Sequence, residues 1–124
     1  MNAMNALTKI TYKANDIIFF EGDIEAHFFL IEKGSITVFT KNKKGEKVIL
    51  AHLGPGEVLG EQAMIDKTER SASAQATEDS VLLKISEESY QQMLRELPLW
   101  AGSMLRSLST RLKQMNNAVK TFKL

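Results

Sequence analysis

A series of short apolar segments, each closed by glycine or polar residues, constrains the fold of this chain more than any other feature. The segments are rich in β-branched and aromatic residues, which favour strands. They are Ile17–Phe20, Phe28–Ile31, Ile36–Thr40, Lys47–Leu53 and Ser80–Ile85. Many short strands with regular turns are typical of a sandwich, roll or barrel, so residues 8–85 are predicted to be mainly β.

Two turn signals organise these strands. Lys33-Gly34 separates Phe28–Ile31 from Ile36–Thr40, and two β-rich runs joined by a short glycine-containing turn predict a hairpin. Gly54-Pro55-Gly56 predicts a further turn after the strand that ends at Leu53.

The pattern changes to helix after residue 85. Ser86 is a good N-cap, and the two glutamates that follow it suit a first helical turn. Pro98 predicts that this helix ends near Glu96, because the residue before a proline disfavours the helical region. A second, longer helix is expected from Leu99 to about Thr121.

The long helix has an apolar seam. Its members are spaced alternately by four and three residues, and they are Ala101, Leu105, Leu108, Leu112, Met115, Val119 and Phe122. A period of 3.5 residues is typical of a helix that pairs with another helix. The seam therefore predicts a homodimer through residues 99–122, with packing against the protein's own sheet as the alternative.

Composition excludes several classes of protein. A length of 124 residues with 44% hydrophobic residues suits one domain, residues 1–124. The absence of cysteine excludes a disulfide framework, a thiolate metal site and a cysteine nucleophile. No apolar run approaches the ~20 residues of a membrane span, and residues 1–6 do not resemble a signal peptide. We therefore expect no membrane span and a cytoplasmic location.

The C-terminal part of the chain is basic. Residues 97–124 contain five lysine or arginine residues and no acidic residue. A basic segment can attract nucleic acid or acidic lipid, but it is also the ordinary solvated face of a helix near its C-terminus.

The segment from Gly60 to Ser71 has the residues best suited to bind a ligand. Gly60 permits close backbone approach, and Glu61–Ile65 can form one helical turn whose free N–H groups attract an anion. Arg70 provides a planar fork that matches phosphate oxygens. A carboxylate, an arginine and the Ser71 hydroxyl together suit a ligand with both a phosphate and a ribose hydroxyl. The alternative is a surface ion pair between Glu61 and Arg70, which contributes little.

These residues resemble the cyclic-nucleotide-binding domain family. Its phosphate-binding cassette has the form G-E-x-A followed by R-[ST]-A, and this chain has Gly60-Glu61-Gln62-Ala63 and Arg70-Ser71-Ala72. The resemblance extends from about Ile10 to Asn117. Within the family, the chain is most similar in type to the sensor domain of the catabolite activator. It implies a mainly β, jelly-roll-like β-roll of about eight strands over residues 8–85. A short cassette helix and C-terminal helices over residues 86–122, ending in a long one, complete the implied fold.

The resemblance also implies roles for individual residues in the cassette. Glu61 would accept the ribose 2′-hydroxyl of a cyclic nucleotide, and Arg70 would pair with its phosphate. Ser71 would reach the phosphate or the base. The backbone N–H groups near Gln62 and Ala63, just after Gly60, would face the phosphate.

Residues outside the cassette complete the implied site. Val38 and Leu50 are expected to line the pocket around the base and sugar. In the catabolite activator a threonine–serine pair of the long helix contacts adenine. The matching residues here are Met115 and Asn116; the methionine cannot make that hydrogen bond, whereas Asn116 can.

We therefore expect a cyclic-nucleotide receptor that is not an enzyme and holds no metal or cofactor. The resemblance favours cyclic AMP as the ligand, because serine follows the cassette arginine in cyclic-AMP receptors of the family, as Ser71 does here; cyclic GMP is an alternative. The chain leaves no room for a DNA-binding domain, so regulation of an unknown protein partner, or of its own dimer, is expected. Another alternative is an interaction module that no longer binds nucleotide. A metal enzyme of the cupin type would have to use His27 and His52, the only histidines.

Overall fold

The computed structural model describes residues 7–122, with the side chains of residues 113 and 116–122 outside the description. The chain divides into two compact units at the Tyr90–Gln91 peptide bond. The first unit contains the strands, and the second contains most of one helix and all of another. The prediction of a single domain stays a prediction.

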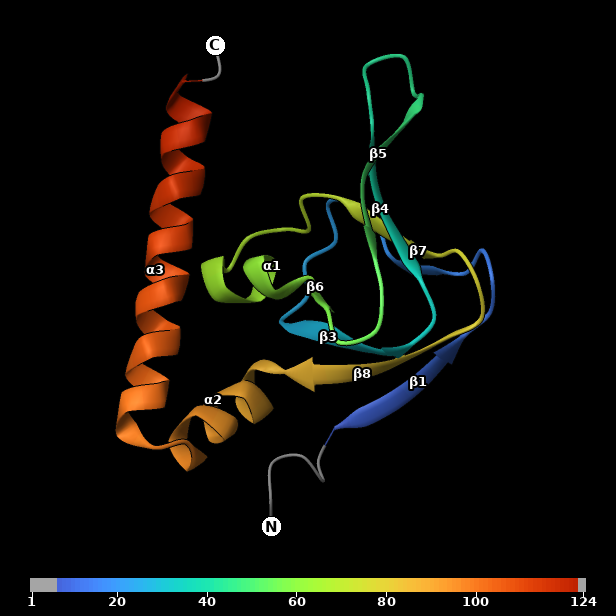
Figure 1. The fold of residues 1–124 in the computed structure, drawn as a ribbon. Coiled ribbons are helices and arrows are strands. Elements are labelled where there is room, and N and C mark those ends of the chain that lie inside the picture. The colour runs from blue at the N-terminus through green and yellow to red at the C-terminus, as the bar shows by residue number, and fades with distance from the viewer. Residues whose placement is uncertain (1–6, 123–124) are drawn as a thin grey trace. The chain divides into compact units, whose positions relative to one another are not determined.

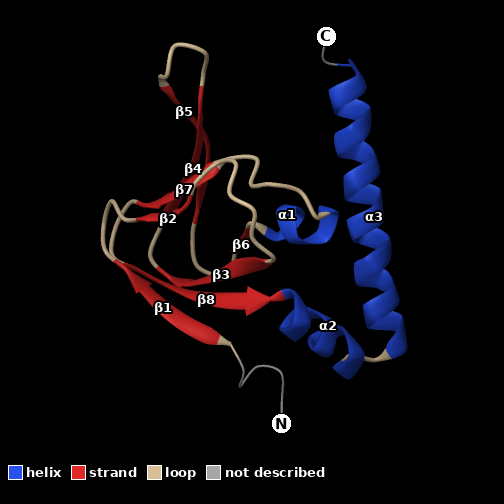
Figure 2. Ribbon diagram, turned by 180° about the vertical axis from the view of Figure 1, so that it is seen from behind, coloured by secondary structure: helices blue, strands red, loops and turns tan. Residues whose placement is uncertain are grey.

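The first unit is a β-roll of two antiparallel sheets, as predicted (Figures 1 and 2). Each sheet has four strands within the described residues. In the first sheet the order is β1 (Thr8–Tyr12), β8 (Ser80–Ser86), β3 (His27–Lys33) and β6 (Val58–Leu59). In the second sheet the order is β2 (Ile17–Phe19), β7 (Ser73–Ala76), β4 (Ile36–Lys41) and β5 (Lys47–Leu53).

The core lies between the two sheets, and both contribute to it. Large side chains of the first sheet meet alanines of β7 in the second. The buried cluster consists of Phe19, Phe29, Ile31, Ile36, Leu59, Ala74, Ala76 and Leu82. Alternate residues of most strands face this cluster, which is the period-2 pattern of sheets that pack through one face.

The predicted hairpin of β3 and β4 is wrong. β3 pairs with β8 and β6, whereas β4 pairs with β5 and β7 in the other sheet. The chain turns a corner from one sheet to the other at Gly34, where φ is 100°. A short glycine turn serves a hairpin or a corner equally well, because only the pairing partners supplied by distant segments distinguish the two.

The hairpin in this region is formed by β4 and β5 instead. Its turn is closed by a hydrogen bond from the Gly45 N–H to the Asn42 carbonyl at 2.9 Å. The Asn42 side chain also accepts from the N–H groups of Lys44 and Glu46. The turn predicted at residues 54–56 is confirmed, since the Glu57 N–H donates to the Gly54 carbonyl.

The helices begin and end close to the predicted residues. They are α1 (Glu61–Asp66), α2 (Glu87–Glu96) and α3 (Leu99–Phe122). The N-cap prediction is confirmed, since the Ser86 hydroxyl accepts the Ser89 N–H at 3.1 Å. No helix in the described part of the chain is both long enough and apolar enough to cross a membrane.

The apolar seam of α3 is exposed along much of its length. Leu105, Leu108, Leu112 and Met115 are all exposed. The side chains of Val119 and Phe122, also predicted members of the seam, lie outside the described residues.

Gly34→Ala tests the corner between the sheets. A Cβ at residue 34 would lie 2.1 Å from the Ser80 Oγ and 2.7 Å from the Ser80 Cα. We expect this overlap and the positive φ to lower the free energy of unfolding by about 3 kcal/mol or more. Urea denaturation measures the change.

Gly22→Ala is the matched control, because Gly22 has φ 92° and no atom within 4 Å of the added Cβ. It should cost only the backbone strain, about 1–2 kcal/mol. Equal losses for the two variants would show that the contact with Ser80 does not define the corner.

Candidate functional site

A cavity of about 270 Å³ opens beside α1, between the ends of the two sheets. This volume lies just below the range of about 300–1,000 Å³ that is usual for ligand pockets. The lining residues come from β2, β4, β5, β6, α1 and the segment that leads into β7. They are Phe19, Val38, Leu53, Val58, Leu59, Gly60, Glu61, Gln62, Ala63, Arg70, Ser71 and Ala72.

Gly60 sets the entrance to α1. It is the N-cap residue with φ 79°, and no side chain caps the first N–H groups of the helix. A Cβ at this position would lie 2.4 Å from the Nη1 of Arg70. Glycine therefore allows both the left-handed backbone and the close approach of the guanidinium.

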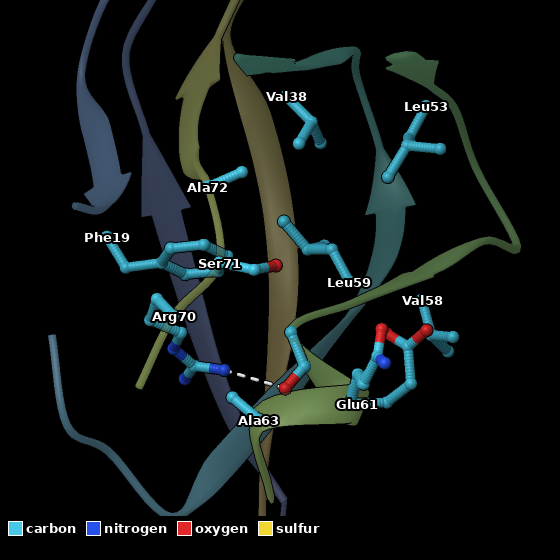
Figure 3. Close-up of a pocket in the computed structure, with 12 residues that line it drawn as sticks. Phe19, Val38, Leu53, Val58, Leu59, Glu61, Ala63, Arg70, Ser71 and Ala72 are labelled. Atoms are coloured by element: carbon cyan, nitrogen blue, oxygen red, sulfur yellow. Dashed lines mark hydrogen bonds between the residues drawn. The ribbon is translucent and has the colours of Figure 1, made fainter. Parts of the chain in front are cut away.

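Arg70 is buried in the wall of the cavity, with 1% of its surface exposed. Its Nη1 donates to the Gly60 carbonyl at 2.7 Å (Figure 3), and its Nη2 donates to the His27 carbonyl at 2.7 Å. Its guanidinium carbon lies 4.4 Å from the centre of the Phe19 ring, a cation–π contact. The guanidinium thereby links three segments that are far apart in the sequence.

One donor of Arg70 remains unpaired among the described residues. Its buried Nε has no hydrogen-bond partner, although more than nine-tenths of buried polar groups have one. Arg70 and Ser71 lie on one side of the cavity and Glu61 on the other (Figure 3). The cavity thus combines a buried positive charge with a carboxylate and a hydroxyl.

Glu25 and His27 both contact the guanidinium of Arg70 at its Nη2. The Glu25 Oε2 is 3.0 Å from the His27 Nε2 and 3.4 Å from the Arg70 Nη2. The His27 ring also meets the Phe29 ring edge-on at 5.2 Å. Burial lowers the pKa of His27, Lys84 and Arg70 lower it further, and Glu25 partly opposes them.

The cavity brings together most of the residues that the sequence singled out. Gly60, Glu61, Gln62, Ala63, Arg70, Ser71 and Val38 all line it. That these residues bind a ligand stays a prediction.

Two predicted site residues, Leu50 and Asn116, are not among those that line the cavity in the described part of the chain. Leu50 is 55% exposed and is not among the residues that line the cavity. It is the extra residue of a bulge, since Val38 pairs with Ala51 and Phe39 with Ile49, and a bulge redirects side chains along a strand. The side chain of Asn116 lies outside the described residues.

Sequence reasoning missed five lining residues, Phe19, Leu53, Val58, Leu59 and Ala72. Val58 and Leu59 directly precede the first cassette motif and Ala72 is the last residue of the second, and these positions were the signal that could have identified them. Phe19 has no such signal, because it lies on β2 and reaches Arg70 only through the tertiary fold.

Comparison with known proteins agrees with this geometry. The family model of the cyclic nucleotide-binding domain matches residues 9–96. The chain belongs to the cyclic nucleotide-binding domain family. The "Cyclic AMP receptor protein" of Thermus thermophilus is 37% identical over 112 residues, which cover 90% of this chain and 52% of the relative.

Solved structures show the same fold. The crystal structure of the Thermus thermophilus catabolite activator protein has a TM-score of 0.77 at 34% identity, covering 96% of this chain and 56% of that one. The cyclic-AMP-bound form of the EAL enzyme Bd1971 has a TM-score of 0.69 at 30% identity, covering 92% of this chain and 31% of that one. Its cyclic-GMP-bound form has 0.70 at 31% identity, covering 90% and 30%.

These matches cover only part of each larger protein. This family member spans about half the length of the curated relatives that it matches first.

Arg70→Lys tests the structural role of the guanidinium. Lysine retains the charge but lacks the planar fork whose Nη1 and Nη2 reach the Gly60 and His27 carbonyls separately, so at least one of these contacts should be lost or lengthened. We expect the free energy of unfolding to fall by about 1–3 kcal/mol, the cost of one buried carbonyl without a donor. Urea denaturation without ligand measures the fall.

Ser71→Ala is the control, because Ser71 is an exposed neighbour and its loss should change stability by no more than about 0.5 kcal/mol. An Arg70→Lys protein as stable as the parent would show that the two carbonyl contacts contribute nothing to stability.

Proposed function

We propose that this domain is a receptor for a cyclic nucleotide, with cyclic AMP as the preferred ligand, and that ligand binding regulates a partner or its own dimer. The observation that carries the proposal is the buried Arg70 guanidinium with an unpaired Nε in the wall of a cavity. A buried cation needs an anion or further acceptors to offset its desolvation. A cyclic phosphate supplies both in one group.

The cassette residues divide the ligand among them. Arg70 binds the phosphate through a charge-assisted hydrogen bond, which is about twice as strong as a neutral one. Glu61 accepts the ribose 2′-hydroxyl, and Ser71 reaches the phosphate or the base. The N–H groups at Gln62 and Ala63 add donors at the start of α1, which no side chain caps.

Apolar side chains suit the rest of the ligand. Val38, Leu53 and Leu59 lie above the charged residues in the cavity (Figure 3). They provide an apolar surface for the base and sugar, while the charged groups fix the orientation of the phosphate. In this arrangement the site binds and orients a nucleotide, and we propose no reaction for it.

Cyclic GMP is the second candidate ligand. The EAL enzyme Bd1971, similar to this chain, has been solved in both cyclic-AMP-bound and cyclic-GMP-bound forms. Ser71 has a hydroxyl that can donate and accept, so it does not by itself reject guanine. We favour cyclic AMP because a relative at 37% identity is named a cyclic AMP receptor protein.

Calorimetric titration with cyclic AMP and cyclic GMP tests the receptor function. The parent protein should bind cyclic AMP more tightly. Glu61→Gln should weaken binding about tenfold or more, because it removes a charged acceptor. The compound 2′-deoxy cyclic AMP should lose more affinity for the parent than for Glu61→Gln, since the glutamine amide oxygen accepts only a neutral hydrogen bond from the 2′-hydroxyl.

Glu69→Gln is the matched control, an exposed glutamate near the cassette that should leave the affinity unchanged. If neither cyclic nucleotide binds the parent, the receptor function is wrong and the alternative of a nucleotide-free interaction module is favoured.

The output of the receptor is proposed to be α3. Its exposed seam, with Leu105, Leu108, Leu112 and Met115, has the 3.5-residue period of a helix that pairs with a second helix. A second copy of the chain provides an identical seam. Ligand binding would regulate such a dimer by favouring the one of two states that it binds more tightly.

Leu112→Glu tests the dimer. Sedimentation equilibrium of the parent should give about twice the chain mass of 13.9 kDa, and Leu112→Glu should give the monomer because it places a charge in the seam. Gln114→Glu adds the same charge at an exposed residue outside the seam and should remain a dimer. A monomeric parent, with and without cyclic AMP, would contradict the proposal.

A further inference from the structure

The Glu25 carboxylate contacts both Arg70 and His27. The function proposed above gives His27 no role. A single oxygen, the Glu25 Oε2, lies 3.0 Å from the His27 Nε2 and 3.4 Å from the Arg70 Nη2. The His27 carbonyl accepts from the same Nη2 at 2.7 Å. Residues 25 and 27 therefore hold one end of the guanidinium through a side chain and a backbone group.

We propose that Glu25 and His27 are positioning residues for Arg70, and that the anionic ligand and a proton on His27 bind cooperatively. The proposal rests on the proposed function, because it takes the ligand of Arg70 to be a cyclic phosphate. His27 lies outside the phosphate-binding cassette, so its role in binding is additional to those of the cassette residues.

The charges around His27 explain the cooperativity. Arg70 and Lys84 of β8 disfavour a proton on the imidazole, and Glu25 favours it. An anion bound to Arg70 offsets the positive field of the guanidinium, so the pKa of His27 should rise on binding. α1, which packs against β3, contains the acidic residues Glu61 and Asp66. Their negative charges favour a proton on His27 both with and without the ligand, so they do not oppose the rise in its pKa.

Competition between His27 and Arg70 for the Glu25 carboxylate also favours ligand binding when His27 is protonated. A protonated imidazole binds the Glu25 carboxylate more strongly than a neutral one. The longer contact between Glu25 and the Arg70 Nη2 then weakens, which leaves more of the guanidinium for the phosphate. Both effects make the ligand bind more tightly when His27 is charged.

The sign of the pH dependence follows by reciprocity. If the ligand raises the pKa of His27, protonation of His27 must raise the affinity for the ligand by the same factor. In the free protein this pKa lies below the ordinary value of 6.5. The affinity should therefore be constant at alkaline pH, rise as the pH falls through the pKa of His27 in the complex, and level off below its pKa in the free protein.

Histidine NMR titration is the direct test. The chain has two histidines, and the His52→Gln variant assigns their signals. Cyclic AMP should raise the pKa of His27. The His52 ring lies on the other sheet, where its Nδ1 pairs with the Thr37 hydroxyl. An unchanged pKa of His27 in the cyclic-AMP complex would overturn the proposal.

Calorimetry in buffers of different ionisation enthalpy measures the same coupling. The parent should take up protons with cyclic AMP, and acidification should raise its affinity toward a limit set by the coupling between the two sites, about fivefold at the lower end of the usual range. His27→Gln should lose the proton uptake, and His52→Gln should keep it.

Glu25→Gln tests the role of Glu25. It should shift the pH response of the affinity to more acidic values, because Glu25 holds the pKa of His27 up. Glu21→Gln is the control in the same loop, where the Glu21 carboxylate accepts from the Thr40 hydroxyl; it should retain the parent's pH response.

The outcomes separate this proposal from the receptor function. Binding of cyclic AMP without proton uptake would overturn the cooperativity and leave the receptor function intact. Proton uptake that persists in His27→Gln would assign it to another group and also overturn the proposal. No binding of any cyclic nucleotide at any pH would overturn both.

Discussion

The buried guanidinium of Arg70 is the interaction on which the site depends. It binds the carbonyls of Gly60 and His27 and lies over the Phe19 ring. These contacts join the start of α1, the start of β3 and the end of β2. Among the described residues its ion-pair partner is Glu25, 3.4 Å from the Nη2. Arg70 therefore connects the segments that form the wall of the cavity and places a buried positive charge there.

Two glycines let the backbone adopt this arrangement. Gly34 lets the chain pass from one sheet to the other beside Ser80, and Gly60 lets α1 begin against the guanidinium. Both have positive φ angles, which residues with a Cβ rarely adopt. Gly34 allows the corner between the sheets, and Gly60 allows the close packing of α1 against Arg70. The same residue type thus allows the corner between the sheets in one place and the shape of the cavity in the other.

Local patterns in the sequence predicted the elements well. Strand patterns and capping predicted a mainly β segment and the helices, and the resemblance carried by the cassette motifs implied the β-roll and a shared site for Glu61, Arg70 and Ser71, which line one cavity. Such features depend on neighbouring residues, so the sequence contains them directly. The pairing of strands does not, and the predicted hairpin at Lys33-Gly34 was wrong because distant segments decide whether a turn closes a hairpin or a corner.

The amino-acid sequence by itself determined the family, the strand and helix segments and the polar groups of the cassette, because each is encoded in short spacings. Only the tertiary structure decided that Arg70 is buried, that Phe19 lies against it, and that Leu50 sits in a bulge away from the cavity. It alone brought Glu25 and His27 to the guanidinium. Burial and contacts across more than forty residues arise when the two sheets pack together, and no local pattern specifies them.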